Sequence, residues 1–275
     1  MPEKRHDHRR GCELQIHHQR AEKPNLERLM DRVRFTTRIE HAEQTAVSSL
    51  WRSARHQSAN SSLSASIGPS LITSGWAGWL RYGKGGRRQI FLFLMPGDFI
   101  VPGLFTPEAC DLVSLTPLRT VDARPLIQTA STFTPSTGAL LADSGRYYRL
   151  LLLDHLTRLT SGCTTSAVAH LLAEFHLRSM RSGAFANGRF SMPIGQRVIA
   201  SALGRSTVQI NKIIQQFQAD GLLTVGYDWI GLRDKKRLCE LAGMSHTAFG
   251  ARHSASTNEH EEALRPEIMD MALFG

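Results

Sequence analysis

The stretch from Pro193 to Leu223 constrains the fold more than any other part of the sequence, because two short helical patterns flank a single glycine there. Apolar residues recur at three- and four-residue steps in both patterns, as expected for helices that each bury one face. Gly204 lies at the junction, where glycine can adopt the positive φ angle that a sharp corner requires. Ser206 or Thr207 then caps the second helix. This spacing predicts a helix-turn-helix.

The second helix carries short or forked polar side chains on its outward face, of the kind that reach base edges and phosphates in a major groove. They are Ser206, Thr207, Gln209, Asn211 and Lys212. An ordinary helical hairpin with a hydrated polar face would show the same pattern. Two short strand patterns follow at once, Leu222–Val225 and Trp229–Leu232, with a turn at Gly226–Asp228. A helix-turn-helix followed directly by a β-hairpin is a winged helix, which favours DNA as the partner.

The charge distribution supports a polyanionic partner. The 275-residue chain has a formal net charge of +9 and a pI near 9.9. Between Arg178 and Arg237 there are ten Lys or Arg against three Asp, so most of the excess lies on the predicted DNA-reading region.

Cysteine usage and hydropathy indicate an intracellular protein. The four cysteines are far apart and form no C-x-x-C pair, which argues against a zinc ribbon or a disulfide scaffold. No apolar run approaches the length of a membrane span. We therefore expect a cytoplasmic protein without a membrane segment.

Further motifs in the same order along the chain resemble the Crp/Fnr transcription regulators. Besides Val208–Lys212, where one branch of that family reads Val-His-Val-Asn-Arg, the matching segments are Ala169–Glu174, Gly75–Ala77, Gly86–Ile90 and Pro96–Asp98. The resemblance covers roughly residues 70 to 243. It implies an α+β chain in which an amino-terminal β-roll of the cyclic-nucleotide-binding type is joined by a long dimerisation helix to a carboxy-terminal winged helix-turn-helix.

The expected domain order combines this resemblance with the local patterns. Residues 1–34 read as a basic, His-rich, disordered arm. The β-roll spans 35–140, the dimerisation helix 141–182, the winged helix-turn-helix 183–243 and a flexible tail 244–275. Within the dimerisation helix, the leucines at 152, 156 and 159 form a seam suited to pairing with a second copy; Leu152, Leu156 and Leu159 are the predicted dimer contacts. Ser161–Thr165 are poor helix formers and predict a break.

The β-roll departs from the family where a cyclic nucleotide would bind. Aligned on Pro96–Asp98, the family's Gly-Glu pair for the ribose falls on Val101–Pro102, and its Arg-Ser pair for the cyclic phosphate falls near Ala109–Cys110. A buried phosphate without a guanidinium partner binds poorly. We expect a roll that has lost the nucleotide chemistry and holds no cofactor.

For DNA, the family's three main base-reading positions fall on Thr207, Val208 and Lys212. Arg205 and Gln196 are expected on phosphates, and Arg197 beside them completes the predicted DNA-binding set. Double-stranded DNA and a second copy are the expected partners, with RNA polymerase left open as a further one.

Three alternatives remain open on the sequence. For a non-specific, nucleoid-type DNA binder, the basic arm and the degenerate β-roll would suffice. An effector sensor could use haem or another ligand in the β-roll, and haem would need an axial ligand such as Cys110 or His155. An iron–sulfur centre is disfavoured by the scattered cysteines. An enzyme is disfavoured because the sequence shows no nucleophile–base pair, metal-ligand spacing or phosphate loop.

Overall fold

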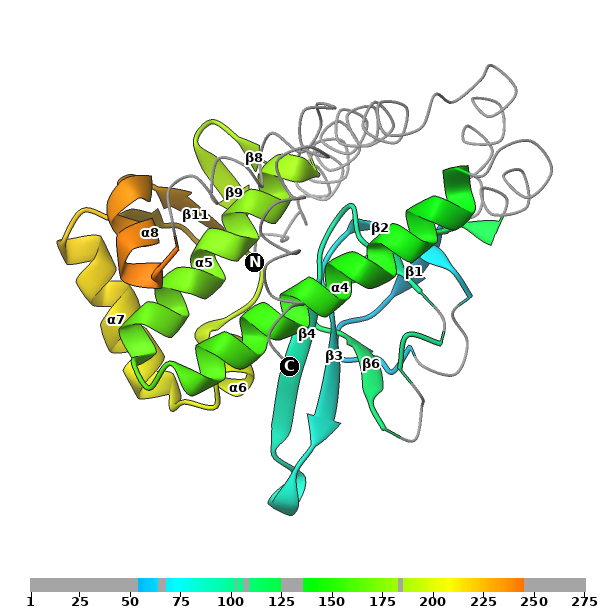
Figure 1. Cartoon of the computed structure of the whole chain (residues 1–275), viewed down its shortest axis with the longest axis horizontal. Coiled ribbons are helices and arrows are strands. Elements are labelled where there is room, and N and C mark those ends of the chain that lie inside the picture. Colours follow the sequence, from blue (N-terminus) through cyan, green and yellow to red (C-terminus); the bar gives the residue numbers. More distant parts are fainter. Residues whose placement is uncertain are drawn as a thin grey trace, which may run out of the picture.

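The computed structural model describes residues 54–63, 68–101, 103–105, 109–124, 136–182 and 185–244, without the side chains of residues 136–143 and 181. The expected amino-terminal arm and nearly all of the expected tail therefore lie outside the described residues. The described part is an α+β chain in which the strands of two sheets come first, and helices and a third, carboxy-terminal sheet follow (Figure 1). This agrees with the predicted fold class.

Two antiparallel sheets form the β-roll. The first has the strand order β1-β7-β2-β5, built from Arg55–Gln57, Leu118–Asp122, Ser70–Ser74 and Phe99–Ile100. The second has the order β4-β3-β6, built from Arg88–Leu94, Ala77–Tyr82 and Asp111–Ser114. A short 3₁₀ turn at Lys84–Gly86 joins β3 to β4. The strands expected around residues 71–73, 76–82 and 89–95 are all present, because alternation and glycine turns specify hairpins locally.

The β4-β3-β6 sheet is buried on both faces. Trp79, Leu92 and Leu94 face the other sheet and form one core with Ile72 and Leu118. On the opposite face, Leu80, Ile90, Phe93 and Val113 belong to a second core that continues through the helices and the carboxy-terminal sheet. The β-roll and the helix-turn-helix therefore share one hydrophobic core.

Gly75 permits the tight approach between the β2–β3 connection and the loop before β7. Its φ angle is +78°, and a Cβ atom there would lie 2.0 Å from the carbonyl oxygen of Pro117. Only glycine fits this backbone. The neighbouring Trp76 packs edge-on against Phe175 with ring centroids 4.8 Å apart, which joins the β-roll to the helices.

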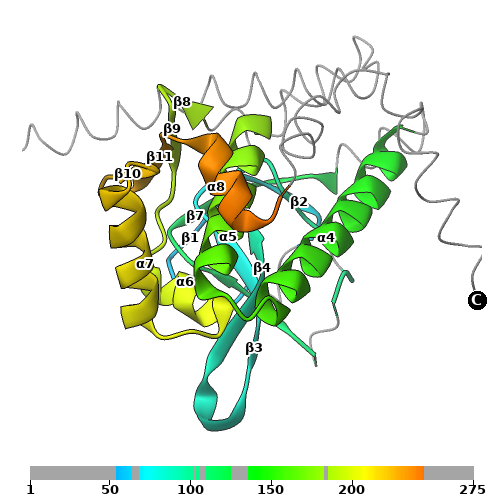
Figure 2. The same ribbon diagram turned by 60° about the vertical axis from the view of Figure 1, so that its left-hand side comes forward.

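The helices follow in the order α4 (Ser136–Thr160), α5 (Thr164–Arg181), α6 (Gln196–Leu203), α7 (Thr207–Ala219) and α8 (Lys235–Ala242). The predicted long helix is thus two helices, and the break lies within the poor helix formers, between Thr160 and Thr164. The two helices differ in environment: α4 runs along the outside of the β-roll, whereas α5 lies between the roll, the carboxy-terminal sheet and α8 (Figures 1 and 2).

The carboxy-terminal sheet has the antiparallel order β10-β11-β9-β8, from Leu223–Val225, Trp229–Leu232, Arg189–Ser191 and Phe185–Ala186. The sequence predicted β10 and β11 but not β8 and β9. The turn between β8 and β9 is Asn187–Gly188, and both residues have positive φ. An Asn-Gly pair between apolar residues is a strong hairpin signal that would have revealed this addition.

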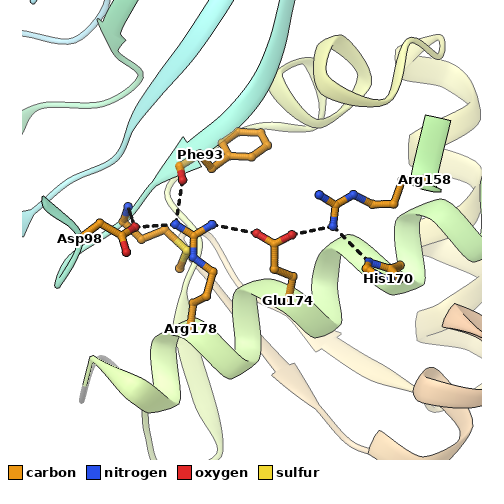
Figure 3. A network of polar contacts seen from close by, with 7 residues as sticks. Phe93, Asp98, Arg158, His170, Glu174 and Arg178 are labelled. Atoms are coloured by element: carbon orange, nitrogen blue, oxygen red, sulfur yellow. Dashed lines mark hydrogen bonds and ion pairs between the residues drawn. The ribbon is translucent and has the colours of Figure 1, made fainter. Parts of the chain in front are cut away.

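A buried ionic network joins the β-roll to α4 and α5 (Figure 3). Arg178 of α5 donates hydrogen bonds to Glu174 (2.8 Å), to the carbonyl oxygen of Phe93 (2.7 Å) and to Asp98 of the Pro-Gly-Asp turn. On its other side, Glu174 accepts a hydrogen bond from Arg158 of α4, which also lies 3.1 Å from Nδ1 of His170. Both arginines and Glu174 are buried.

This network is electrostatically self-consistent. Burial alone would raise the pKa of Glu174, but the charges of Arg158 and Arg178 outweigh it and lower that pKa. Burial acts to lower the pKa of Arg178, yet Asp98 and Glu174 hold it above the ordinary arginine range. Glu174 and Arg178 are therefore both charged, as buried groups can be when they are paired and hydrogen-bonded.

Candidate DNA-binding site

The corner between α6 and α7 follows from Gly204. This residue ends α6 in the left-handed conformation with φ 63°, and its N–H donates to the carbonyl oxygen of Ala200. The N–H of Arg205 also donates to Ala200, at 3.0 Å. The turn brings the buried faces of the two helices together, with Ile199 and Leu203 of α6 in the same core as Ile210 of α7. These contacts leave the opposite face of α7 to solvent.

Ser206 and Gln209 form a capping box at the start of α7. The hydroxyl of Ser206 accepts from the backbone N–H of Gln209 at 3.2 Å, and Oε1 of Gln209 accepts from the backbone N–H of Ser206 at 3.1 Å. Of the two caps that the sequence allowed, the structure therefore has Ser206 and not Thr207. Because Oε1 of Gln209 is hydrogen-bonded within the capping box, the side chain cannot at the same time make a bidentate contact with adenine, which needs both amide atoms.

The exposed face of α7 holds the remaining predicted base readers. Thr207, Val208, Asn211 and Lys212 are exposed, and Val208 is 65% accessible although it is apolar. Gln215, one helical turn beyond Asn211, extends the same face and is also exposed. The sequence interpretation missed Gln215, which the four-residue helical step from Asn211 identifies.

The predicted phosphate contacts flank this face on α6 and its turn. Arg197 is exposed, whereas Gln196 and Arg205 are half-buried. Within the described residues, the Nε atom of Arg205 is buried without a hydrogen-bond partner. The predicted DNA-binding residues of α6 and of the turn are therefore at least partly accessible to solvent.

The wing carries an aromatic side chain and a cation. Tyr227 is fully exposed at the tip of the β10–β11 turn. At the base of the wing, the guanidinium of Arg189 lies over the ring of Trp229, 3.8 Å from the ring centroid. The indole also lies against Gly226, where a Cβ atom would come within 2.1 Å of the ring. The wing thus has a packed base and a free tip.

The interior of the β-roll is lined by apolar groups where the resemblance places a nucleotide. Trp79, Phe91 and Phe105 pack edge-on, with ring centroids 5.0 and 5.2 Å apart. Tyr148 of α4 is buried against them and donates a hydrogen bond to the carbonyl oxygen of Phe99 at 2.6 Å. Cys110 is buried in the same core, and burial raises the pKa of its thiol. Pro102 lies outside the described residues.

Neither residue considered for haem lies in an evident cofactor site. Cys110 packs in the β-roll core, whereas His155 lies near Arg158 and Glu174 of the ionic network. Burial, with a smaller contribution from Arg158, lowers the pKa of His155 to about 4. Among the described residues, no group of three His, Cys, Asp or Glu side chains is arranged to hold a metal ion.

The leucines that α4 exposes to solvent are not the same set as the predicted dimer contacts. Leu150, Leu153 and Leu156 of α4 are 53%, 58% and 56% exposed. Leu152 and Leu159 are half-buried, and Leu152 packs against the β-roll core. The exposed stripe shares Leu156 with the predicted seam and is rotated away from the protein's own core. The sequence could not separate the two faces because leucines occupy both.

Comparisons with known proteins agree with this architecture. Residues 166–241 match the family model of the Crp-like helix-turn-helix domain. Three similar solved structures are FixK2 from Bradyrhizobium japonicum (20% identity, 68% of this chain and 96% of that chain, TM-score 0.58), a CooA mutant from Carboxydothermus hydrogenoformans (18%, 69% and 87%, 0.50) and the CRP-family regulator TTHB099 from Thermus thermophilus (13%, 69% and 96%, 0.50). No curated protein matches the sequence.

These findings define the class of protein. The chain carries a Crp-like helix-turn-helix domain within the fold of the Crp/Fnr transcription regulators, as the sequence motifs indicated. Among the residues that the structure describes, no helix is both long and apolar enough to cross a membrane.

Proposed function

We propose that the protein is a dimeric transcription regulator that binds a palindromic DNA site in the cytoplasm and does not respond to cyclic AMP. The observation that carries this proposal is the exposed face of α7, which presents Thr207, Val208, Asn211 and Lys212 within a Crp-like helix-turn-helix domain that also has an exposed wing. Such a face fits a major groove, whereas catalysis would need a cleft with a nucleophile and base.

The residues of this face and its surroundings are expected to play different parts in DNA recognition. Lys212 can reach a guanine edge or a phosphate, and the methyl groups of Val208 can lie against a thymine methyl. Arg205 and Arg197 supply positive charge at the side of the helix, where phosphates pass. We therefore expect Lys212 to contribute to base preference and Arg205 to contribute affinity for any sequence.

A second copy is the partner that best fits α4. The exposed leucines recur at three-residue steps along a helix of 25 residues, roughly 37 Å long. A stripe of this kind is suited to a helix-helix seam, and two copies of α4 would bury both stripes. Two readers held in this way would each bind one half-site of a palindrome.

The interior of the β-roll supports independence from cyclic AMP. Alignment with the family puts its Arg-Ser pair, which holds the cyclic phosphate, near Ala109 and Cys110. Neither of these two side chains can pair with an anion. Trp79, Phe105 and Tyr148 belong to the apolar core of the roll. Calorimetry with millimolar cyclic AMP should show no saturable heat, and stoichiometric binding would contradict this part of the proposal.

A competition experiment tests the regulator against the non-specific nucleoid alternative. Labelled DNA carrying a site found on the protein's own genome is bound and then challenged with unlabelled specific or unrelated duplex. A regulator should favour its own site by at least about 4 kcal/mol, or roughly 1,000-fold. Equal competition by both duplexes would favour the non-specific binder.

Two alanine variants separate base reading from phosphate binding. Lys212→Ala should cost about 1–3 kcal/mol on the specific site and relax the preference at one base pair. Arg205→Ala should weaken all sequences alike and reduce the salt dependence by about one phosphate contact. If Arg205→Ala changed the preferred sequence and Lys212→Ala did not, the placement of α7 in the groove would be wrong.

A further inference from the structure

The β3–β4 hairpin carries a concentrated positive charge at its tip. The eight residues from Arg81 to Arg88, here called the basic hairpin tip, contain Arg81, Lys84, Arg87 and Arg88 and no carboxylate. Arg81, Lys84 and Arg87 are exposed. Within the described residues, Lys84 and Arg87 make no ion pair or side-chain hydrogen bond. Their charges are therefore available to an outside partner.

The hairpin is fixed relative to the DNA-reading helices. The hydroxyl of Ser201 in α6 donates a hydrogen bond to the carbonyl oxygen of Arg88, at 2.6 Å. Ile90 of β4 belongs to the same core as Ile199 and Leu203 of α6. Because Ser201 lies three residues before Gly204, these contacts tie the start of β4 to the end of α6 where the chain turns into α7.

The same contacts place the tip beside the predicted DNA-binding face. Figures 1 and 2 both show the hairpin leaving the β-roll next to α6 and projecting past that helix, close to its turn into α7. Arg205 lies in that turn, so both the hairpin tip and the turn carry positive charge near the corner between α6 and α7. Glycines at 83, 85 and 86 keep the tip narrow enough to approach a backbone closely.

We propose that the basic hairpin tip is a second DNA contact, which binds phosphates of the duplex flanking the half-site read by α7. The proposal rests on the proposed function. A cluster of cations without acids, on a hairpin tied to the helix that leads into α7, matches the uniform negative charge of a DNA backbone. An acidic protein surface is the other partner such a tip fits, and the experiment below separates the two.

The test uses the full-length protein, the variant Lys84→Ala/Arg87→Ala and two duplexes. One duplex ends at the half-sites, and the other extends about one helical turn further on each side. Fluorescence anisotropy measures affinity for both across a salt series. The wild-type protein should bind the extended duplex more tightly and with a steeper salt dependence. The variant should lose that advantage and match the wild-type protein on the short duplex.

The size of the effect follows from counterion release. Removing one phosphate-binding cation should reduce the slope of log affinity against log salt by about 0.9. The loss of affinity on raising the salt from 50 to 200 mM should therefore be about threefold smaller for each cation removed. Lys84→Arg/Arg87→Lys should retain the wild-type slope because it keeps both charges. Lys235→Ala/Lys236→Ala removes two exposed cations from α8, which packs on α5, and should leave the difference between the duplexes unchanged.

Each outcome has one meaning. A variant that retains both the extended-duplex advantage and the full salt slope overturns the proposal for the tip while leaving sequence-specific binding intact. A variant with unchanged DNA binding that fails to support transcription by RNA polymerase would assign the tip to a protein partner, which also overturns it. A wild-type protein that does not prefer its site would overturn the proposed function as well.

Discussion

Helices α4 and α5 follow one another in the chain, yet they lie in opposite environments. In α5, every residue from Ala167 to Ser179 is buried, including Glu174 and Arg178. In α4, three leucines are more than half exposed. One helix buries charges, and the other exposes apolar groups. Each departs from the usual amphipathic pattern in its own direction.

The difference between the two helices is that α5 holds parts of the molecule together from the inside, whereas α4 presents an outer surface. The buried charges of α5 are stable only because Asp98, Glu174 and the two arginines pair across the β-roll, α4 and α5. Nothing in the described part of the chain covers the exposed leucines of α4. Changes in α5 should therefore affect folding, whereas changes on the exposed stripe of α4 should affect assembly.

The largest expected effect is on self-association through α4. Leu153→Lys/Leu156→Lys places two charges per copy in the proposed seam, and burying an unpaired charge costs several kcal/mol. The dimer dissociation constant should rise at least about 1,000-fold, and sedimentation should show a folded monomer. Binding to a palindromic site should weaken as well, since each monomer holds one half-site. An unchanged dimer would place the interface elsewhere.

The same substitution in α5 supplies the comparison. Leu171 is 1% exposed and lies in the shared core. Leu171→Lys should therefore unfold the protein rather than release a folded monomer, which circular dichroism distinguishes from the α4 variant. If Leu171→Lys gave a folded monomer, the assignment of α5 to the interior would be contradicted.

Removing the centre of the ionic network comes next in size. Glu174→Ala leaves Arg158 and Arg178 buried without their shared carboxylate, and we expect a loss of about 3–5 kcal/mol in the free energy of unfolding. Glu240→Ala breaks an exposed ion pair with Arg237 and should cost at most about 1 kcal/mol. Urea titrations measure the free energy of unfolding of both variants. Equal losses in the two variants would contradict a structural role of the buried network.

A more gradual effect is the pH dependence that His155 contributes. Its pKa is about 4 in the folded protein and 6.5 in an ordinary setting, so the unfolded chain takes up a proton first as the pH falls. Stability should therefore decline from about pH 6.5 towards pH 4, by at most about 1.4 kcal/mol per pH unit. His155→Leu should flatten this part of the unfolding profile. Equal slopes in both proteins would contradict the buried, neutral state of His155.

Local patterns in the sequence predicted most of the fold. Gly204 and the apolar spacing around it specified the helix-turn-helix, and the strands of the β-roll hairpin followed from alternation and glycine turns. The exposed and buried faces of α4 could not be separated, because periodicity records leucine spacing and not what covers it. The network around Glu174 was also beyond prediction, since it joins residues up to 85 positions apart.

The candidate site was predictable in part for the same reason. Thr207, Val208, Asn211 and Lys212 lie on the exposed face because helical spacing alone decides which side of α7 packs inward. The polar pattern indicated Ser206 or Thr207 as the cap of α7, but it did not reveal that the side chain of Gln209, a predicted DNA contact, also closes a capping box with Ser206. The position of the basic hairpin tip depends on the contact between Ser201 and β4, which only the folded chain supplies.

Selection of binding sites from a random DNA library tests the central claim most directly. The wild-type protein should enrich one palindromic sequence whose half-site centres lie about one helical turn apart, and Lys212→Ala should lose the preference at one position in each half-site. Enrichment of no sequence, or of the same sequence with unchanged preference by Lys212→Ala, would contradict DNA reading by α7.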